Sequence, residues 1–386
     1  MNPEAFKSDQ AGKCVRTLAR YWAFVPAALP PKVAFDKGLV TALSHADAAL
    51  GELAGLVKGG AIGRMHTLIQ AFARREAVLS SRIEGTHTQL DDLLLAEIKD
   101  QRATEDQDLR EVQNYVIAME RGIKLLKTRP IATRLMLELH ALLMDSVRGG
   151  DKTPGEFRKV QNFIGRTGDT VETARYVPPP VEELNGLLAN WEQFANERDA
   201  WPDLVQCAIL HEQFEAIHPF QDGNGRIGRL LITLFLIERK RLPQPMLYLS
   251  AFIEAHRRDY YDTLQAVRTE GDWAGWIRFF LAGVTETSRQ AVRQALHLDA
   301  LRRGYLDQLK GQHRACALVD ELFSNPYITV SRASRRLSVT TPTAQKSIDQ
   351  LQRFDILQEI TGKAWGRIYV ARPILQAIQA PPAERD

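Results

Sequence analysis

The chain has 386 residues, of which 45% are hydrophobic and 25% are charged, and its formal net charge is +3. This composition is ordinary for a globular protein and excludes a long disordered chain or a fibrous repeat. The small net charge excludes a protein that coats nucleic acid over its whole surface, although it is compatible with a local basic face. At about 150 residues per domain, the length predicts two or three domains.

The cysteines and the hydropathy indicate a cytoplasmic protein. Cys14, Cys207 and Cys316 are far apart and odd in number, which disfavours a disulfide scaffold or a cysteine zinc site and fits a reducing compartment. The longest apolar stretch, at 230–237, has eight residues, far fewer than a membrane span requires. The N-terminus has no signal-peptide pattern. We therefore expect no contact with a membrane.

Residues 1–40 alternate prolines with apolar side chains, which predicts an extended arm packed across another surface. Beyond this arm, apolar residues recur at steps of three and four, the period of an α-helix. Helices are predicted over about 41–57, 64–84, 88–94, 106–126, 132–144 and 273–310. The glycine- and threonine-rich segment 163–177 is followed by three prolines and predicts a β-hairpin, with an irregular loop as the alternative.

The chemistry of the chain is concentrated in residues 218–229, HPFQDGNGRIGR, which connect two predicted helices. Gly223 and Gly225 allow successive backbone N–H groups to converge at the N-terminus of the second helix, an arrangement that binds phosphate. Arg226 and Arg229 are about one helical turn apart, so both guanidinium groups can reach the same anion. The segment therefore predicts a site for nucleotide phosphates.

Two further side chains of this segment indicate a reaction at the phosphate. Asp222 offers a hard oxygen ligand, suited to a Mg²⁺ ion that also holds phosphate oxygens. His218 titrates near neutrality and can take a proton from an attacking hydroxyl group. Nucleotide phosphates beside a histidine base predict the transfer of a phosphorus group onto a hydroxyl.

The segment meets every fixed position of the pattern HxFx(D/E)GNGRxxR, and so it resembles the signature of Fic proteins. The resemblance implies a helical fold that uses Mg²⁺ and transfers AMP from ATP to a hydroxyl side chain of a target protein. It implies that His218 is the general base, that Asp222 is the Mg²⁺ ligand and that Asn224 holds the inner phosphates together with the loop amides. The other residues that it assigns to ATP are Gly223, Gly225, Arg226, Gly228 and Arg229.

Residues 80–85, SSRIEG, resemble the inhibitory motif of the same family, (S/T)xxxE(G/N), through Ser80, Glu84 and Gly85. Because this motif precedes the signature, the resemblance is to the branch with an N-terminal inhibitory helix, in which Glu84 would pair with Arg229. The residues agree, since a glutamate at a helix C-terminus opposes the macrodipole and suggests a distant cationic partner. A solvated surface glutamate is the alternative.

The resemblance also indicates where the target and the adenine would bind. It implies that the hairpin at 163–177 is a flap that pairs with an extended target peptide through backbone hydrogen bonds. Tyr260 and Tyr261 resemble the region that frames adenine and ribose, where an aromatic ring would stack on the base. A tyrosine pair on a helix is also typical of a protein core.

The C-terminal part differs in character from the rest. Residues 325–372 contain eight basic and three acidic residues, a net charge of +5. A helix-turn-helix is predicted over 330–354 and two strands over 356–361 and 366–371, and together they resemble a winged-helix domain. The second helix has side chains suited to DNA, namely Thr343, Gln345, Lys346 and Arg353. A docking or dimer module is the alternative.

These patterns predict a mainly α fold, with a Fic helical core and a β-hairpin flap, followed by a small winged-helix (α+β) domain. The expected domains are an N-terminal arm with helices (1–104), the Fic catalytic core (105–300) and the winged helix (311–375). The expected function is a self-inhibited protein adenylyltransferase that also modifies itself.

Two other functions stay open at this point. One is a nucleotide-sensing regulator that binds DNA through the winged helix. The other is transfer of a phosphoryl or phosphocholine group, although the Doc kinase pattern has a lysine where Gly225 stands. The sequence leaves open the target protein, the removal of AMP and the formation of a homodimer.

Overall fold

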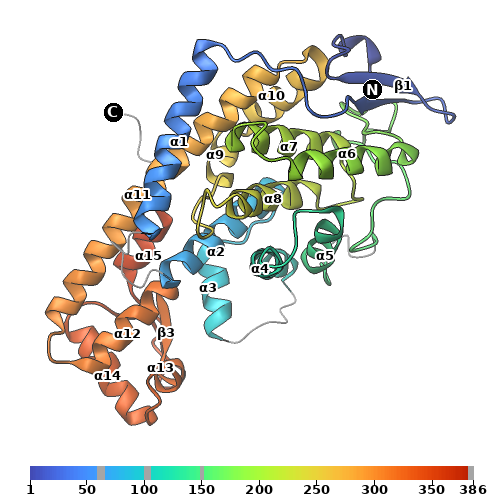
Figure 1. Cartoon of the computed structure of the whole chain (residues 1–386). Helices are drawn as coiled ribbons and strands as arrows, with labels where there is room; N and C mark the ends of the chain where they lie inside the picture. The colour runs from blue at the N-terminus through green and yellow to red at the C-terminus, as the bar shows by residue number, and fades with distance from the viewer. Residues whose placement is uncertain (59–65, 100–105, 148–151, 381–386) are drawn as a thin grey trace.

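The computed structural model describes residues 1–58, 66–99, 106–147 and 152–380, and most of them lie in helices (Figure 1). The mainly α class predicted from the sequence is confirmed. The helices up to residue 308 are α1 (Lys37–Lys58), α2 (His66–Ile83), α3 (Leu90–Ile98), α4 (Gln107–Leu125), α5 (Thr133–Leu143), α6 (Leu184–Asn196), α7 (Asp203–Ile217), α8 (Asn224–Glu238), α9 (Ser250–Ala255), α10 (Arg257–Glu270) and α11 (Trp273–Gln308). Short 3-10 turns occur at Pro3–Ala5 and Val181–Glu183.

The helix ends follow from local chemistry. Helix α4 begins after Asp106, whose carboxylate accepts a hydrogen bond from the backbone N–H of Leu109 at 3.1 Å. The region predicted to hold long helices at 273–310 is a single helix, α11, of 36 residues. It lies beside α1 and extends from the central helices to the C-terminal elements (Figure 1). The predicted helix start at residue 64 and the domain boundary at 104 lie outside the described residues.

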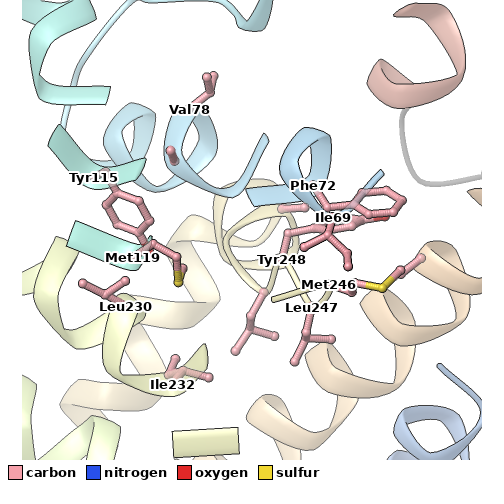
Figure 2. Packing of buried hydrophobic residues seen from close by; sticks show 14 of the residues in the cluster. Ile69, Phe72, Val78, Tyr115, Met119, Leu230, Ile232, Met246, Leu247 and Tyr248 are labelled. Carbon is pink, nitrogen blue, oxygen red and sulfur yellow. The ribbon is translucent and has the colours of Figure 1, made fainter. Parts of the chain in front are cut away.

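A continuous apolar core joins α2, α4 and α8 (Figure 2). Phe72 of α2 stacks on Tyr248, with ring centroids 5.7 Å apart, and Met119 of α4 and Leu230 of α8 lie in the same cluster. Burial of such side chains is the main favourable contribution to folding, at about 1.5–3 kcal/mol for each large one.

Helices α7 and α8 lie at the centre of the molecule. Every residue of α7 from Leu204 to Ile217 is buried, polar ones included, and nearly all of α8 is buried too. A helix that is buried on all sides cannot tilt or shift without disturbing its neighbours. The loop between α7 and α8, which carries the signature segment, is therefore held at both ends by rigid elements.

The N-terminal arm is more ordered than the sequence indicated. Strands β1 (Gly12–Arg16) and β2 (Trp22–Pro26) form an antiparallel hairpin, with Gly12 opposite Pro26 and Arg16 opposite Trp22. The hairpin does pack across another surface, because Phe24 is buried against Tyr176 and its N–H donates to the carbonyl of Val177 at 2.9 Å. A proline-rich pattern without glycine at the turn concealed the strands.

The hairpin predicted at 163–177 is reduced to one pair of residues. Ile164 and Tyr176 exchange both backbone hydrogen bonds, at 2.8 and 3.1 Å, and the residues between them form turns rather than strands. The hydroxyl of Tyr176 donates to the carbonyl of Ala216 at 2.7 Å, which anchors the segment beside the end of α7. We keep the name flap for residues 163–177.

The C-terminal elements pack against the helical core. They are α12 (His313–Ser324), β3 (Tyr327–Thr329), α13 (Val330–Leu337), α14 (Thr341–Arg353), β4 (Gln358–Glu359), β5 (Ile368–Val370) and α15 (Arg372–Gln379), with strand order β3-β5-β4. The predicted helix-turn-helix is present, while the two predicted strands are shorter than expected and α15 was not predicted. The proline-containing tail at 381–386 lies outside the described residues.

Candidate active site

The signature loop begins where α7 ends. His218 takes the left-handed conformation, with φ 50° and ψ 60°, and its N–H still donates to the carbonyl of Phe214 at 2.9 Å. Pro219 follows and cannot continue the helix. Phe220 is fully buried and stacks on His140, with ring centroids 3.9 Å apart, so it anchors the loop as a core residue.

The side chain of Asn224 forms hydrogen bonds within the loop. Its Oδ1 accepts from the N–H of Phe220 and its Nδ2 donates to the carbonyl of the same residue, both at 2.8 Å. The residue is only 2% exposed. Both ends of that amide thus make a hydrogen bond within the loop, and the predicted contact of Asn224 with phosphate stays a prediction.

The predicted anion site falls at the N-terminus of α8. Gly223 lies in the left-handed region at φ 75°, and α8 starts directly after it. The first N–H groups of a helix have no partner within the helix, so they point toward an incoming anion. Glu84 approaches this turn closely, since a Cβ built on Gly225 would lie 2.3 Å from a carboxylate oxygen of Glu84. A side chain at position 225 would thus displace the carboxylate of Glu84.

Gly228 has a packing role. A Cβ at this position would lie 2.4 Å from an oxygen of Glu215 and 3.2 Å from the ring of Phe214, both on α7. The close approach of α7 to α8 gives this glycine a packing role, and its role in holding phosphate stays a prediction.

Arg226 contacts a residue of α4 that was not predicted from the sequence. Its Nη1 donates to Glu111 of α4 at 2.8 Å, and its side chain is 4% exposed. The sequence analysis missed Glu111. The signal was present, since Glu111 precedes Tyr115 and Met119 by four and eight residues and so occupies an apolar position of its helix. An acid in such a position indicates a buried partner.

Arg229 is bound by α2. Its Nε donates to the Ser80 hydroxyl and its Nη2 to the Ser80 carbonyl, both at 2.9 Å, while Nη2 also reaches Glu84 at 2.6 Å. The side chain of Arg229 is 2% exposed and that of Glu84 is 34% exposed. Burial opposes ionisation of Glu84, but the charges of Arg229 and Arg226 outweigh it and lower the pKa of this carboxyl. Both partners are therefore charged at neutral pH.

His218 is electrically neutral at neutral pH. Burial and the nearby charges of Arg158 and Arg268 lower the pKa of its imidazole from 6.5 to about 4. A neutral imidazole can accept a proton, whereas an imidazolium cannot. The geometry therefore offers a proton acceptor at the mouth of an anion site.

Asp222, the acidic residue of the loop, is accessible to solvent. Its side chain is 37% exposed, and the nearest cation on its Oδ2 is Lys152 at 3.4 Å. No group of three His, Cys, Asp or Glu side chains gathers as a metal site among the described residues. A single carboxylate fits Mg²⁺, which commonly takes one or two protein carboxylates and completes its shell with phosphate oxygens and water.

The two tyrosines of α10 have different surroundings. Tyr260 is 1% exposed, and its hydroxyl is hydrogen-bonded to Nε2 of His211 at 2.9 Å. Tyr261 is 38% exposed. Consecutive helical residues point about 100° apart, so one ring enters the core while its neighbour faces outward. The expected adenine contact of Tyr260 is corrected to a core role, and Tyr261 remains accessible to a base.

The chain is similar to known families and proteins. Models described as "Fic/DOC family N-terminal" and "Fic/DOC family" match residues 40–124 and 130–236. The chain is 33% identical over 161 residues to the Protein adenylyltransferase Fic of Aedes aegypti and 32% identical over 161 residues to that of Culex quinquefasciatus. Each match covers 40% of this chain and 28% of the relative, so the chain spans less than a third of their length.

A solved structure supports the fold. The Fic family protein from Desulfovibrio desulfuricans G20 has a TM-score of 0.58 at 20% identity, over 89% of this chain and 98% of that one. The fold and the loop between α7 and α8 thus define the Fic class. This chain thus carries a Fic/DOC family N-terminal region at residues 40–124, directly before a Fic domain at residues 130–236. No helix within the described ranges is both long and apolar enough to cross a bilayer.

Proposed function

We propose that this protein transfers AMP from ATP to a hydroxyl side chain of a target protein and is inhibited by its own Glu84. The observation that carries the proposal is the neutral imidazole of His218 beside the N-terminus of α8, with Arg229 one turn further along that helix. The relatives named protein adenylyltransferase Fic support the same reaction.

In the proposed reaction, the target hydroxyl oxygen attacks the α-phosphorus of ATP. His218 accepts the hydroxyl proton, the bond from the α-phosphorus to the bridging oxygen breaks, and pyrophosphate leaves with that electron pair. Backbone N–H groups at the start of α8 stabilise the phosphate charge. Asp222 would hold a Mg²⁺ ion that neutralises the phosphate oxygens.

Inhibition follows from the contacts of Arg229. Its guanidinium already has three acceptors, two from Ser80 and one from Glu84, and so it is not free to bind the outer phosphate of ATP. Without that contact, the phosphorus would not be aligned for in-line attack. Gly85, at φ +101°, turns the chain directly after Glu84.

The flap supports a proposed binding mode for the target. Phe163 is 40% exposed beside the pair of Ile164 and Tyr176. Residues beyond this pair make no strand ladder of their own, so their backbone groups could pair with an extended peptide.

The test is intact-mass analysis of the full chain after incubation with ATP and Mg²⁺. We expect little self-modification of the wild type, clear addition of AMP to Glu84→Gly, and none in Glu84→Gly/His218→Ala. Addition of a phosphate mass, or no gain in Glu84→Gly under conditions where ATP binds, would overturn the proposal.

A second candidate activity is DNA binding by the C-terminal elements, which are arranged as a helix-turn-helix followed by two strands. The observation that favours it is Trp365, which is 88% exposed in the loop between β4 and β5, between Lys363 and Arg367. An exposed aromatic ring flanked by cations suits nucleic acid.

A further inference from the structure

Arg158, in the segment between α5 and the flap, makes an unusual set of contacts. It is 2% exposed. Its N–H donates to the carbonyl of Pro219 at 2.9 Å, its Nε to the carbonyl of His218 at 3.0 Å and its Nη2 to the carbonyl of Pro179 at 2.6 Å. One residue therefore joins the turn that carries the imidazole to the prolines that end the flap.

The charge of Arg158 has no close ion-pair partner among the described residues, although the carboxylate of Glu182 acts on it from a longer distance. No carboxylate of the described residues lies within ion-pair distance of its guanidinium, and its Nη1 is buried without a hydrogen-bond partner there. Arg268, by contrast, is paired with Glu212 at 3.1 Å. A buried cation without a close anion is costly, and such departures from local rules concentrate at functional sites.

We propose that Arg158 is a positioning residue for the transfer reaction: its guanidinium holds the backbone turn at His218 against the base of the flap, and its positive charge acts on the imidazole. Arg158 would thus fix the position of His218, which takes the proton, relative to the flap, along which the target binds. The inference rests on the proposed function of this site.

The charges around His218 predict the direction in which its pKa changes when the charge of Arg158 is removed. Arg158 and Arg268 disfavour the imidazolium, while Glu84 and the carbonyl of Glu215 favour it. Because Arg268 is neutralised by Glu212, loss of the Arg158 charge should have the larger effect. The pKa of His218 would then rise from about 4 toward its ordinary value of 6.5.

The kinetic test compares Arg158→Gln, which removes the charge, with Arg158→Lys, which keeps it. Both are made in full-length Glu84→Gly, whose rate should stay flat down to about pH 5 because the base there has a pKa of about 4. We expect the activity of Arg158→Gln to fall at a higher pH than that of the parent, since the base then has a higher pKa. Arg158→Lys should keep the parent profile but lower kcat by about 10- to 100-fold, since the forked contacts that fix the turn are lost. The KM for ATP should change little in both.

Histidine NMR of the nucleotide-free variants provides a readout that does not depend on catalysis, with the His218 signal assigned from its loss in His218→Gln. The His218 titration should move toward pH 6.5 in Arg158→Gln and stay in place in Arg158→Lys. If the chain transfers no AMP at all, this titration still decides whether Arg158 acts on His218.

Three results would overturn the proposal. One is a His218 titration that is unchanged in Arg158→Gln. Another is a lower kcat in both variants that accompanies a lower unfolding midpoint, while the pH profile stays unchanged. A purely structural role of Arg158 would give this result. If Arg158→Gln does not fold, a parent-like kcat in Arg158→Lys would be the third.

Discussion

The contact between Glu84 and Arg229 shows how two residues that are each unfavourable alone become favourable together. Glu84 follows the last turn of α2, where the helix dipole disfavours an anion. Arg229 is almost completely buried, and among the described residues Glu84 is its only ion-pair partner. The pair is therefore a stabilising contact as well as the proposed inhibitory one.

Glu84→Gly should lower stability while it raises transfer. We expect the free energy of unfolding to fall by about 1–3 kcal/mol, less than for a fully buried pair because a third of the Glu84 side chain is exposed. ATP with Mg²⁺ should raise the unfolding midpoint of the variant by more than that of the wild type, since a phosphate can replace Glu84 as the partner of Arg229. Thermal unfolding with and without ATP measures both effects. An equal ATP shift in the two proteins would contradict this account.

Among the elements, α7 and α8 carry the site because they are the most deeply buried helices, and neighbouring helices set their spacing. Helix α4 contributes Glu111 to Arg226 and also approaches α8 at Gly122. A Cβ at Gly122 would lie 2.8 Å from Leu234 of α8. The absence of a side chain at Gly122 thus allows α4 to lie close to α8.

Gly122→Ala should therefore destabilise the protein, by about 1–3 kcal/mol, even though alanine favours helix by about 1 kcal/mol. The matched control is Gly51→Ala in α1, where a Cβ meets nothing within 4 Å and where we expect a gain of up to about 1 kcal/mol. Urea unfolding of the two variants at neutral pH makes the comparison. Similar shifts of the same sign in both would show that helix propensity, and not the spacing of α4 and α8, decides the result.

In the whole molecule, the C-terminal elements are packed onto the helix that carries the inhibitory motif. Arg75 of α2 donates to the carbonyls of Ile378 and Ala380, at 3.1 and 2.9 Å, and Gln294 of α11 donates to Ala377 at 2.9 Å. The loop between β4 and β5, with Trp365, stays exposed. Ligands of that loop could thus bind without reaching the signature loop.

Neutralising Lys346, Lys363 and Arg367 together tests the DNA hypothesis on the full chain. If these residues contact phosphates, the salt dependence of DNA binding should flatten by about one unit of slope per lost contact. Transfer of AMP should change little, because none of the three lies in the signature loop. DNA titrations at two salt concentrations provide the measurement.

The matched control neutralises three exposed basic residues of the N-terminal hairpin: Lys13, Arg16 and Arg20. Equal weakening by both triple variants would indicate attraction by net charge alone. Absence of binding by the wild type at low salt would exclude DNA as a partner of these elements, since even non-specific phosphate attraction should appear there.

The sequence by itself determined those features whose causes are local. Helical periods, the glycine-rich turn before α8 and the placement of a histidine, an acid and two arginines within 12 residues all follow from neighbours along the chain. They were sufficient to predict the helical class and to propose an anion site, and the motif also led to the pairing of Glu84 with Arg229, which are 145 residues apart.

Only the tertiary structure decided which side chains of the site have hydrogen-bond or ion-pair partners within the protein. It directs the Asn224 amide to Phe220, joins Arg226 to Glu111 and places Tyr260 in the core. It also brings Arg158 to the carbonyl of His218, 60 residues away. Periodicity tells which face of a helix is buried but not which element covers that face. A buried polar group needs a hydrogen-bond partner, and only the tertiary structure shows which distant residue supplies it.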